Sequence, residues 1–155
     1  MKPSDELLAE QLGVIANTCS LQADSVYHLE VYESSGLAGA SNAANYPCFV
    51  YRKSDFAPEL ELSGEAEVQD DTYEVTCVAQ DSDALRCMAG ALQRTYHYRF
   101  LAGLQTAYPS VLDWLVENDS EQNEFAVEQQ DKGYKTATMI VRIVTDTMTG
   151  AETCP

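Results

Sequence analysis

The chain has 155 residues, 45% of them hydrophobic, and its formal net charge is −16. This length corresponds to one domain, and the apolar content argues for a folded core rather than an intrinsically disordered chain. The nine Lys and Arg residues form no basic stripe, which argues against tight binding to nucleic-acid phosphates. There is no signal-peptide pattern and no apolar stretch of membrane-spanning length, so we expect a soluble protein made in a cytoplasm, with no membrane partner.

The first elements are predicted from apolar periodicity. Leucines at helical spacing predict a helix from about Ser4 to Thr18, with Ser4 as its N-cap. A strand is expected from Ser25 to Tyr32, with His28 on its more exposed face. A loop rich in Gly, Ser and Asn is expected from Glu33 to Asn45.

The stretch from Tyr46 to Gln80 is predicted to be two strands joined by an acidic arm. The strands are Pro47–Lys53 and Tyr73–Gln80, and the arm covers about residues 54–72. In the second strand, Tyr73, Val75 and Cys77 are expected on one face, with Glu74, Thr76 and Val78 on the other. Ten carboxylates and no Lys or Arg lie between Asp55 and Asp83, so this region projects negative charge.

Alternation within the arm predicts an extended β-hairpin. Its apolar side chains have little to pack against within one chain, so we expect them to contact a neighbouring subunit. This predicted interface consists of Phe56, Leu60 and Leu62. The predicted acidic surface, on the arm or lining a channel, consists of Glu59, Glu61, Glu65, Glu67, Asp70 and Asp71.

A long helix is predicted from about Asp83 to Leu101, capped by the segment Asp81–Asp83. Its inward face is expected to carry Ala84, Leu85, Met88, Leu92, Tyr96 and Phe100.

The last third of the chain is less periodic. The segment from Tyr108 to Asn118 is either a short helix opened by Pro109 or a strand carrying Trp114, and we favour the helix. The remaining expected elements are a strand at Phe125–Gln130, a turn at Lys132–Gly133, a central strand at Tyr134–Thr145 and a loose tail at 147–155.

These elements predict a single α+β domain over residues 1–146. Its sheet is expected to be mixed or mostly antiparallel, with two main helices packed on one face and the arm extending beyond the core.

The five cysteines are an odd number, widely spaced and without a CxxC pair. We interpret them as small buried hydrophobic residues in a reducing compartment, rather than as disulfides or metal ligands. They are Cys19, Cys48, Cys77, Cys87 and Cys154.

No enzyme motif for nucleophilic, zinc, phosphate-binding or dinucleotide chemistry occurs, so we expect no catalysis, no cofactor and no metal. The acid pairs Asp70/Asp71 and Asp81/Asp83 are explained by turns and helix caps. Aromatic and cationic residues alternate from Arg94 to Arg99 around His97, a pattern also found where proteins stack on bases. We favour a structural interpretation, with Tyr96 packed inward and Arg94, His97 and Arg99 facing solvent or a neighbouring carboxylate.

The order of elements, with the strands "PCFVY" and "YKTATMIVRIVTD" and the strand-into-helix segment "YEVTCVAQDSDALRCMAGAL", resembles the tail terminator and tail completion proteins of long-tailed bacteriophages. The resemblance covers about Ser4 to Asp146, while the segments Ser25–Asn45 and Leu104–Asn123 depart from the shorter members.

The resemblance implies a hexameric ring that caps the tail tube in the virion. Its partners would be copies of itself, the tail tube protein and the head-side connector or stopper protein, and DNA would pass without specific binding. Two alternatives remain open: another head-tail adaptor of the neck, or an acidic module that mimics nucleic-acid charge.

Overall fold

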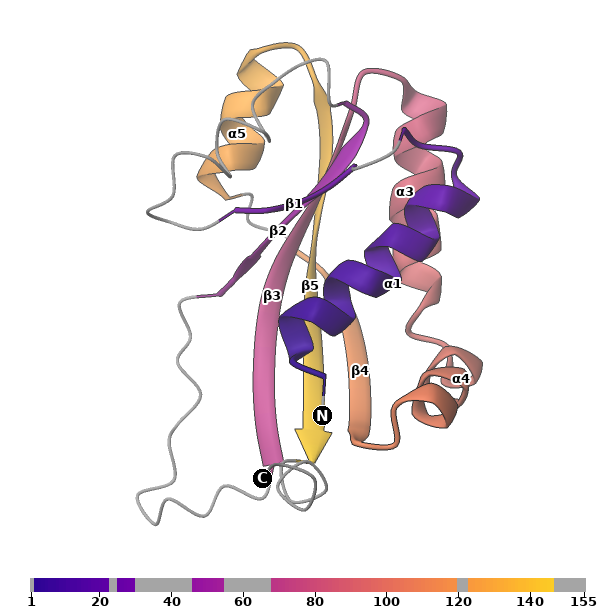
Figure 1. Cartoon of the computed structure of the whole chain (residues 1–155). Coiled ribbons are helices and arrows are strands. Elements are labelled where there is room, and N and C mark those ends of the chain that lie inside the picture. The colour runs from indigo at the N-terminus through magenta and orange to yellow at the C-terminus, as the bar shows by residue number, and fades with distance from the viewer. Residues whose placement is uncertain (1, 23–24, 30–45, 55–67, 120–122, 147–155) are drawn as a thin grey trace.

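The computed structural model describes residues 2–22, 25–29, 46–54, 68–119 and 123–146. These residues form an α+β domain in which a mixed five-stranded sheet has the order β1-β2-β3-β5-β4 (Figure 1). Strand β1 is parallel to β2, and the other pairs are antiparallel. The strands are β1 (Val26–His28), β2 (Cys48–Lys53), β3 (Val68–Ala79), β4 (Val111–Asn118) and β5 (Lys135–Asp146). The helices are α1 (Ser4–Thr18), α3 (Ser82–Arg94), α4 (Tyr98–Ala107) and α5 (Glu124–Asp131).

The helices lie on both faces of the sheet. Helices α1, α3 and α4 cover one face, and α5 covers one end of the other (Figure 1). The predicted alternation in β3 is confirmed, because Tyr73, Val75 and Cys77 belong to the larger core while Val78 packs against Phe125 of α5. The prediction of two main helices on one face is likewise confirmed by α1 and α3.

Strands β3 and β5 form the central ladder of the molecule. They pair over twelve residues each, from Val68 opposite Asp146 to Ala79 opposite Lys135. At about 3.4 Å per residue this ladder is roughly 40 Å long. The near-continuous apolar run of β5 had indicated an interior strand, and β5 indeed lies between β3 and β4.

The first helix has the predicted bounds but not the predicted cap. Pro3 occupies the N-cap position, and Ser4 lies inside α1 with its side chain directed at the sheet. The predicted strand at Ser25–Tyr32 corresponds to β1, which covers Val26–His28. Residues 30–32 lie outside the described part of the chain. His28 is half-buried rather than on an exposed face, because its ring stacks on Tyr51 with centroids 4.8 Å apart.

The predicted helix from Asp83 to Leu101 is two helices. Helix α3 ends at Arg94, and α4 begins at Tyr98. The Thr95 hydroxyl donates to the carbonyl of Leu92 at 2.6 Å and accepts the indole N–H of Trp114 at 2.9 Å, so a tertiary contact holds the chain at this break. As a result Tyr96 is 66% exposed and does not pack inward, whereas Met88 and Leu92 are buried as predicted.

Two predictions in the last third are wrong. Residues 111–118 form strand β4 rather than a short helix, since Trp114 packs in the core opposite Ile143 of β5. The segment Phe125–Gln130 is helical, because the Asn123 side chain caps α5 by accepting the N–H of Ala126 at 2.7 Å. The turn that follows is confirmed, with Gly133 at a φ of 89°.

The interpretation of the cysteines is partly wrong. Cys19, at the end of α1, forms a disulfide with Cys87 of α3. Cys48 and Cys77 are buried and unpaired, as expected for small hydrophobic residues. Cys154 lies outside the described residues, as do the predicted loop at Glu33–Asn45 and the predicted tail at 147–155. Among the described helices, none is both long and apolar enough to cross a membrane.

Candidate functional site: the root of the arm and the open sheet face

Most of the predicted site falls outside the part of the chain that the structure describes. This applies to the predicted interface residues Phe56, Leu60 and Leu62, and to Glu59, Glu61, Glu65 and Glu67. Asp70 and Asp71 are described, and they belong to β3 rather than to an arm that continues to residue 72. The strand begins at Val68, and the backbone N–H of Ser54 donates to Thr72 at 2.9 Å, so the root of the arm lies at Ser54 and Val68.

Asp71 is an internal carboxylate, not part of an acidic surface. It is 1% exposed on the sheet face under α1. One oxygen accepts hydrogen bonds from the Ser4 hydroxyl at 2.5 Å and from Gln69 Nε2 at 2.9 Å, and the other lies 3.0 Å from Lys53 Nζ. This cluster joins the first turn of α1 to both strands at the root of the arm.

Tyr73 extends this cluster into the core. Because the Ser4 hydroxyl donates to Asp71, the phenol of Tyr73 is the donor in its 2.7 Å contact with Ser4. Burial raises the pKa of Tyr73 to about 12, so the phenol keeps its proton and this donor role throughout the neutral range.

Asp70 points to the opposite face of the sheet. Arg142 of β5 binds it in a two-pronged ion pair, with Nε 2.8 Å from both carboxylate oxygens. This hydrogen bonding lowers the pKa of Asp70. Asp70 is therefore partly neutralised, and neither described member of the predicted acidic surface presents a free carboxylate.

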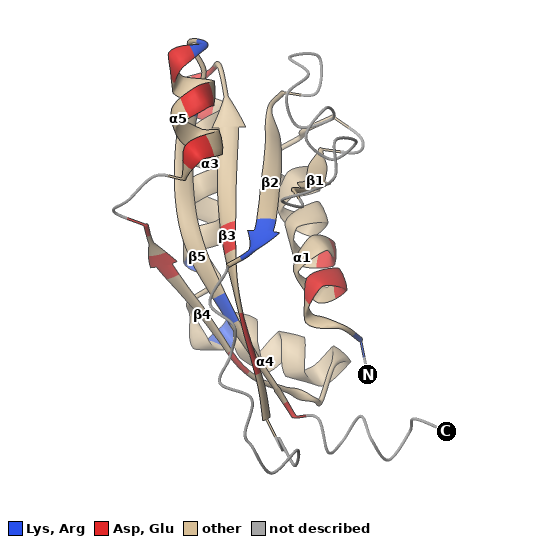
Figure 2. Ribbon diagram, turned by 90° about the vertical axis from the view of Figure 1, so that its left-hand side faces the viewer, with Lys and Arg blue, Asp and Glu red and all other residues tan. Residues whose placement is uncertain are grey.

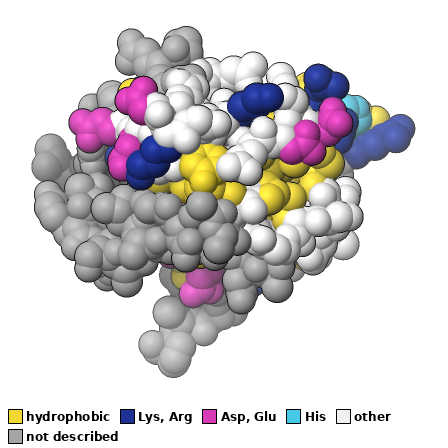
Figure 3. Space-filling model, turned by 90° about the horizontal axis from the view of Figure 1, so that it is seen from above, with side chains coloured by type: hydrophobic (Ala, Val, Ile, Leu, Met, Phe, Trp, Pro, Cys, Tyr) yellow, Lys and Arg dark blue, Asp and Glu magenta, His cyan; other side chains and the backbone are white. Residues whose placement is uncertain are grey.

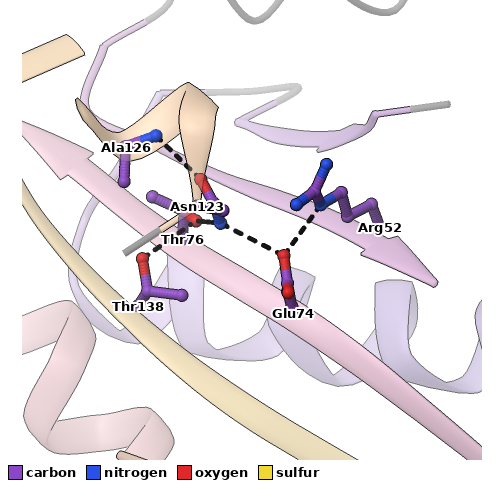
Figure 4. Close-up of polar contacts among 6 residues, drawn as sticks. All are labelled: Arg52, Glu74, Thr76, Asn123, Ala126 and Thr138. Carbon is purple, nitrogen blue, oxygen red and sulfur yellow. Dashed lines mark hydrogen bonds and ion pairs between the residues drawn. The ribbon is translucent and has the colours of Figure 1, made fainter. Parts of the chain in front are cut away.

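A polar network fixes the end of α5 on this second face (Figure 4). Asn123 Nδ2 donates to Thr76 Oγ1 at 3.0 Å and to Glu74 at 3.4 Å, and Arg52 Nε donates to the same Glu74 oxygen at 2.8 Å. Thr76 in turn lies 3.2 Å from the hydroxyl of Thr138. The network marks the boundary between the part of the sheet that α5 covers and the rest of this face.

Beyond that boundary, no described helix covers the second face. The residues there alternate along β3, β5 and β4, and they mix apolar, acidic and basic side chains. Val68 is 47% exposed and Leu115 38% exposed, so this open sheet face has partly apolar character. A surface that mixes apolar and charged side chains is typical of contacts between proteins rather than of a ligand pocket. The open sheet face consists of Val68, Asp70, Thr72, Ile140, Arg142, Val144, Leu115 and Glu117.

The two depressions found beside α1 are open and shallow. One of about 430 Å³ lies between α1 and β1, and one of about 320 Å³ lies between α1 and α4. Neither contains a histidine or a cysteine. Across the described ranges, no group of three His, Cys, Asp or Glu side chains is placed to hold a metal. Asp81 serves as the N-cap of α3, as predicted, by accepting the N–H of Asp83 at 3.1 Å.

The aromatic and cationic segment between α3 and α4 is a surface feature. His97 is the N-cap of α4, and its Nδ1 accepts the N–H of Arg99 at 3.2 Å. Its ring lies 4.5 Å from the ring of Tyr98, which is 68% exposed. The exposure of Arg94, His97 and Arg99 is confirmed, and the sequence pattern had already singled out this segment.

Charge is spread unevenly over the domain. Acidic positions lie on α1, α5, β3 and β4, and basic positions lie at the end of β2, on β5 and at the end of α5 (Figure 2). Viewed from above, apolar side chains occupy the middle of the surface with charged side chains around them (Figure 3).

Neither a scan against protein-family models nor a search of curated proteins found a match to this chain.

Proposed function

We propose that this chain is a structural virion protein of the tail terminator type, a ring-forming subunit that caps the tail tube and joins it to the head connector. The observation that carries the proposal is the place of the acidic segment. Residues 55–67 connect Ser54, after β2, to Val68, the first residue of β3, and within them Glu and Leu alternate over positions 59–62. A segment of this composition, joined to a sheet of which one face is partly without a described helix, favours contact between copies of the chain.

The order of described elements supports the same function. Helix α1 precedes β1 and β2, the acidic segment separates β2 from β3, β3 runs through a capped turn into α3, and β5 closes the domain. This is the order on which the resemblance to tail terminator and tail completion proteins rests. The function needs no catalytic group, and we assign none.

The net charge of −16 supports the passage of DNA without binding, because like charge weakens association with phosphates. Its partners on this proposal are further copies of the chain, the tail tube protein and a head-side connector or stopper protein. The assembly would form in the host cytoplasm and remain in the tail or neck of the virion.

Light scattering and negative-stain electron microscopy test the proposal, with the purified chain alone and mixed with tail tubes. We expect closed rings that bind one end of a tube. The matched variant replaces Phe56, Leu60 and Leu62 with Ser, and it should assemble less while its far-UV circular dichroism stays unchanged. Monomers under both conditions would overturn the proposal.

The net charge also favours a second candidate, an acidic module that occupies the nucleic-acid site of a basic partner. That function predicts binding to a basic protein that falls steeply with salt, and no dependence on the three apolar residues of the arm. Rings that assemble through an apolar contact would exclude it, while another adaptor of the neck would form rings that bind the head side only.

A further inference from the structure

The turn between α3 and α4 carries exposed side chains that packing does not explain. Tyr96 and Tyr98 are 66% and 68% exposed, the largest exposed fractions among the described large hydrophobic residues. Arg94, His97 and Arg99 beside them are also exposed. We call these five residues the cationic–aromatic turn. Tyr and Arg are enriched at the centres of protein interfaces, where their rings and guanidinium groups become buried.

The two arginines of the turn are exceptional within this acidic chain. Six of the nine basic residues form ion pairs with carboxylates of the described chain, and the other three are Arg94, Arg99 and Lys135. Lys135 donates instead to the Ser82 hydroxyl. Arg99 also lies in the first turn of α4, where the helix dipole disfavours a positive charge. Its contacts are with its neighbour Tyr98, whose ring centroid is 5.9 Å from the guanidinium carbon. Stability of the fold therefore does not account for this cation.

The turn lies against the outermost strand of the sheet. Trp114 of β4 donates to Thr95 at 2.9 Å and packs on Phe100, with ring centroids 5.1 Å apart. Within the described residues β4 pairs only with β5, so its other edge has no partner strand. Leu112 and Leu115 on β4 are 43% and 38% exposed. An unpaired edge beside exposed apolar side chains is a site at which a further strand can add.

We propose that the cationic–aromatic turn and the free edge of β4 together bind residues 55–67 of a second copy of this chain. The inference rests on the proposed function, since it names the surface that receives the arm within the assembly. The segment carries five carboxylates and no Lys or Arg, which complements the unpaired Arg94 and Arg99.

The alternation of the segment matches the two faces of the β4 edge. In an added strand, side chains alternate between the faces in the same way as in β4. Trp114 marks the face on which the turn lies, and Leu115 lies on the opposite, open sheet face. Glu59 and Glu61 can therefore face the arginines, while Leu60 and Leu62 cover Leu115.

We assign the bound segment to a second copy rather than to the same chain. Within one chain the segment attaches between β2 and β3, and β5 and β4 separate it from the free edge. A contact between two different surfaces of identical subunits repeats from one subunit to the next, and it forms a ring when the rotation between neighbours closes. Single-stranded nucleic acid also combines negative charge with rings that could stack on the tyrosines of the turn. The net charge of −16 on the chain opposes its approach.

The direct test is binding of a fluorescent peptide of residues 55–67 to a receptor chain whose own arm is disabled by Leu60→Ser and Leu62→Ser. We expect binding that weakens with salt and that falls about tenfold or more in Arg94→Gln/Arg99→Gln. Arg86→Gln is the matched control, because Arg86 is an exposed arginine on α3 that already pairs with Asp83 at 3.9 Å. It should leave peptide binding unchanged.

A mixing experiment tests whether the contact joins two copies. The arm variant and the turn variant should each stay monomeric, and an equimolar mixture should form dimers and no rings, since each pair retains one intact contact. Rings or monomers in the mixture would overturn the proposed contact. Circular dichroism of each variant checks that the fold is retained.

The outcomes separate this inference from the proposed function. Rings of the unmodified chain without peptide binding at the turn would overturn the inference and leave the ring function standing. Peptide binding at the turn without rings of the unmodified chain would overturn the ring function and leave the proposed contact standing. An oligothymidylate that binds the turn while the peptide does not would assign the surface to single-stranded nucleic acid and overturn the inference.

Discussion

Asp70 and Asp71 are adjacent in the sequence and occupy opposite environments, so replacing each with Asn gives a sharp prediction. Asp71 is 1% exposed and interacts with Ser4, Gln69 and Lys53, whereas Asp70 pairs with Arg142 in a partly exposed position. The two substitutions remove the same charge from the same strand and change almost no volume. They therefore isolate the effect of burial.

The magnitude follows from the contacts. The amide that replaces the Asp71 carboxylate keeps one oxygen that can accept hydrogen bonds, but its NH₂ group replaces the other oxygen. Because the groups around position 71 are themselves donors, the interactions of that second oxygen are lost. Because a hydrogen bond to a charged group contributes about 1.5–3 kcal/mol, we expect Asp71→Asn to lower the free energy of unfolding by about 2–4 kcal/mol. The half-exposed position of Lys53 keeps this below the cost of breaking a fully buried pair. Asp70→Asn should cost less than about 1 kcal/mol.

Urea unfolding measures both values, followed by the fluorescence of the single tryptophan, which is 2% exposed in the core. In thermal unfolding the same energies correspond to a decrease in Tm of roughly 4–16 °C for Asp71→Asn and at most about 4 °C for Asp70→Asn. All samples are compared at one protein concentration, because self-association adds stability. Equal effects of the two substitutions, or a change below about 1 kcal/mol for Asp71→Asn, would refute the assignment of Asp71 as a structural carboxylate.

Further predictions concern single groups. Arg142 lowers the pKa of Asp70 in the folded protein. The ion pair therefore stabilises the fold fully above the unfolded pKa near 4, and this contribution is lost as pH falls through the folded pKa. The free energies of unfolding of wild type and Asp70→Asn should therefore become equal in acid. Asn123→Ala should lower the free energy of unfolding by about 1–3 kcal/mol in urea unfolding, because it removes the cap of α5 and the bond to Thr76. Burial raises the pKa of Cys48 to about 12 and also raises that of Cys77, so a thiol reagent near neutral pH should label both only after unfolding. A spectrophotometric titration of Tyr73→Phe against wild type should show one phenol fewer ionising near pH 12.

The elements that periodicity predicted are the long ones. Helix α1 has its predicted bounds, and β2, β3 and β5 appear where alternating or continuous apolar residues had placed them. In an element of this length, the spacing of the buried apolar residues fits either the helical period or the strand period, but not both. The wrong predictions of element type concern the short elements β4 and α5, whose few apolar residues fit a helix or a strand equally well. The predicted helix from Asp83 to Leu101 had the right type but missed the break after Arg94.

For α5 the sequence did contain a usable signal. Asn123 followed by Glu124 is an N-cap with an acidic residue in the first turn, and it would have favoured a helix over a strand. No comparable signal separates Asp70 from Asp71, since only the register of β3 decides which of them lies under α1. The pairing of Cys19 with Cys87 is equally a property of the packed structure, because it depends on α1 lying beside α3.

The break between α3 and α4 shows how a tertiary contact changes which side chains a segment exposes. In a continuous helix Tyr96 would follow Met88 and Leu92 on the buried face, four residues apart each, and Arg94 and Arg99 would lie about 140° apart around the axis. The indole N–H of Trp114 instead bonds to the Thr95 hydroxyl, and α3 stops one residue earlier. The residues after the break turn outward, which exposes Tyr96, and the unpaired arginines lie at the end of α3 and in the first turn of α4. A buried polar contact of one tryptophan thus converts an amphipathic helix into an exposed cationic turn, and the proposed arm contact depends on that conversion.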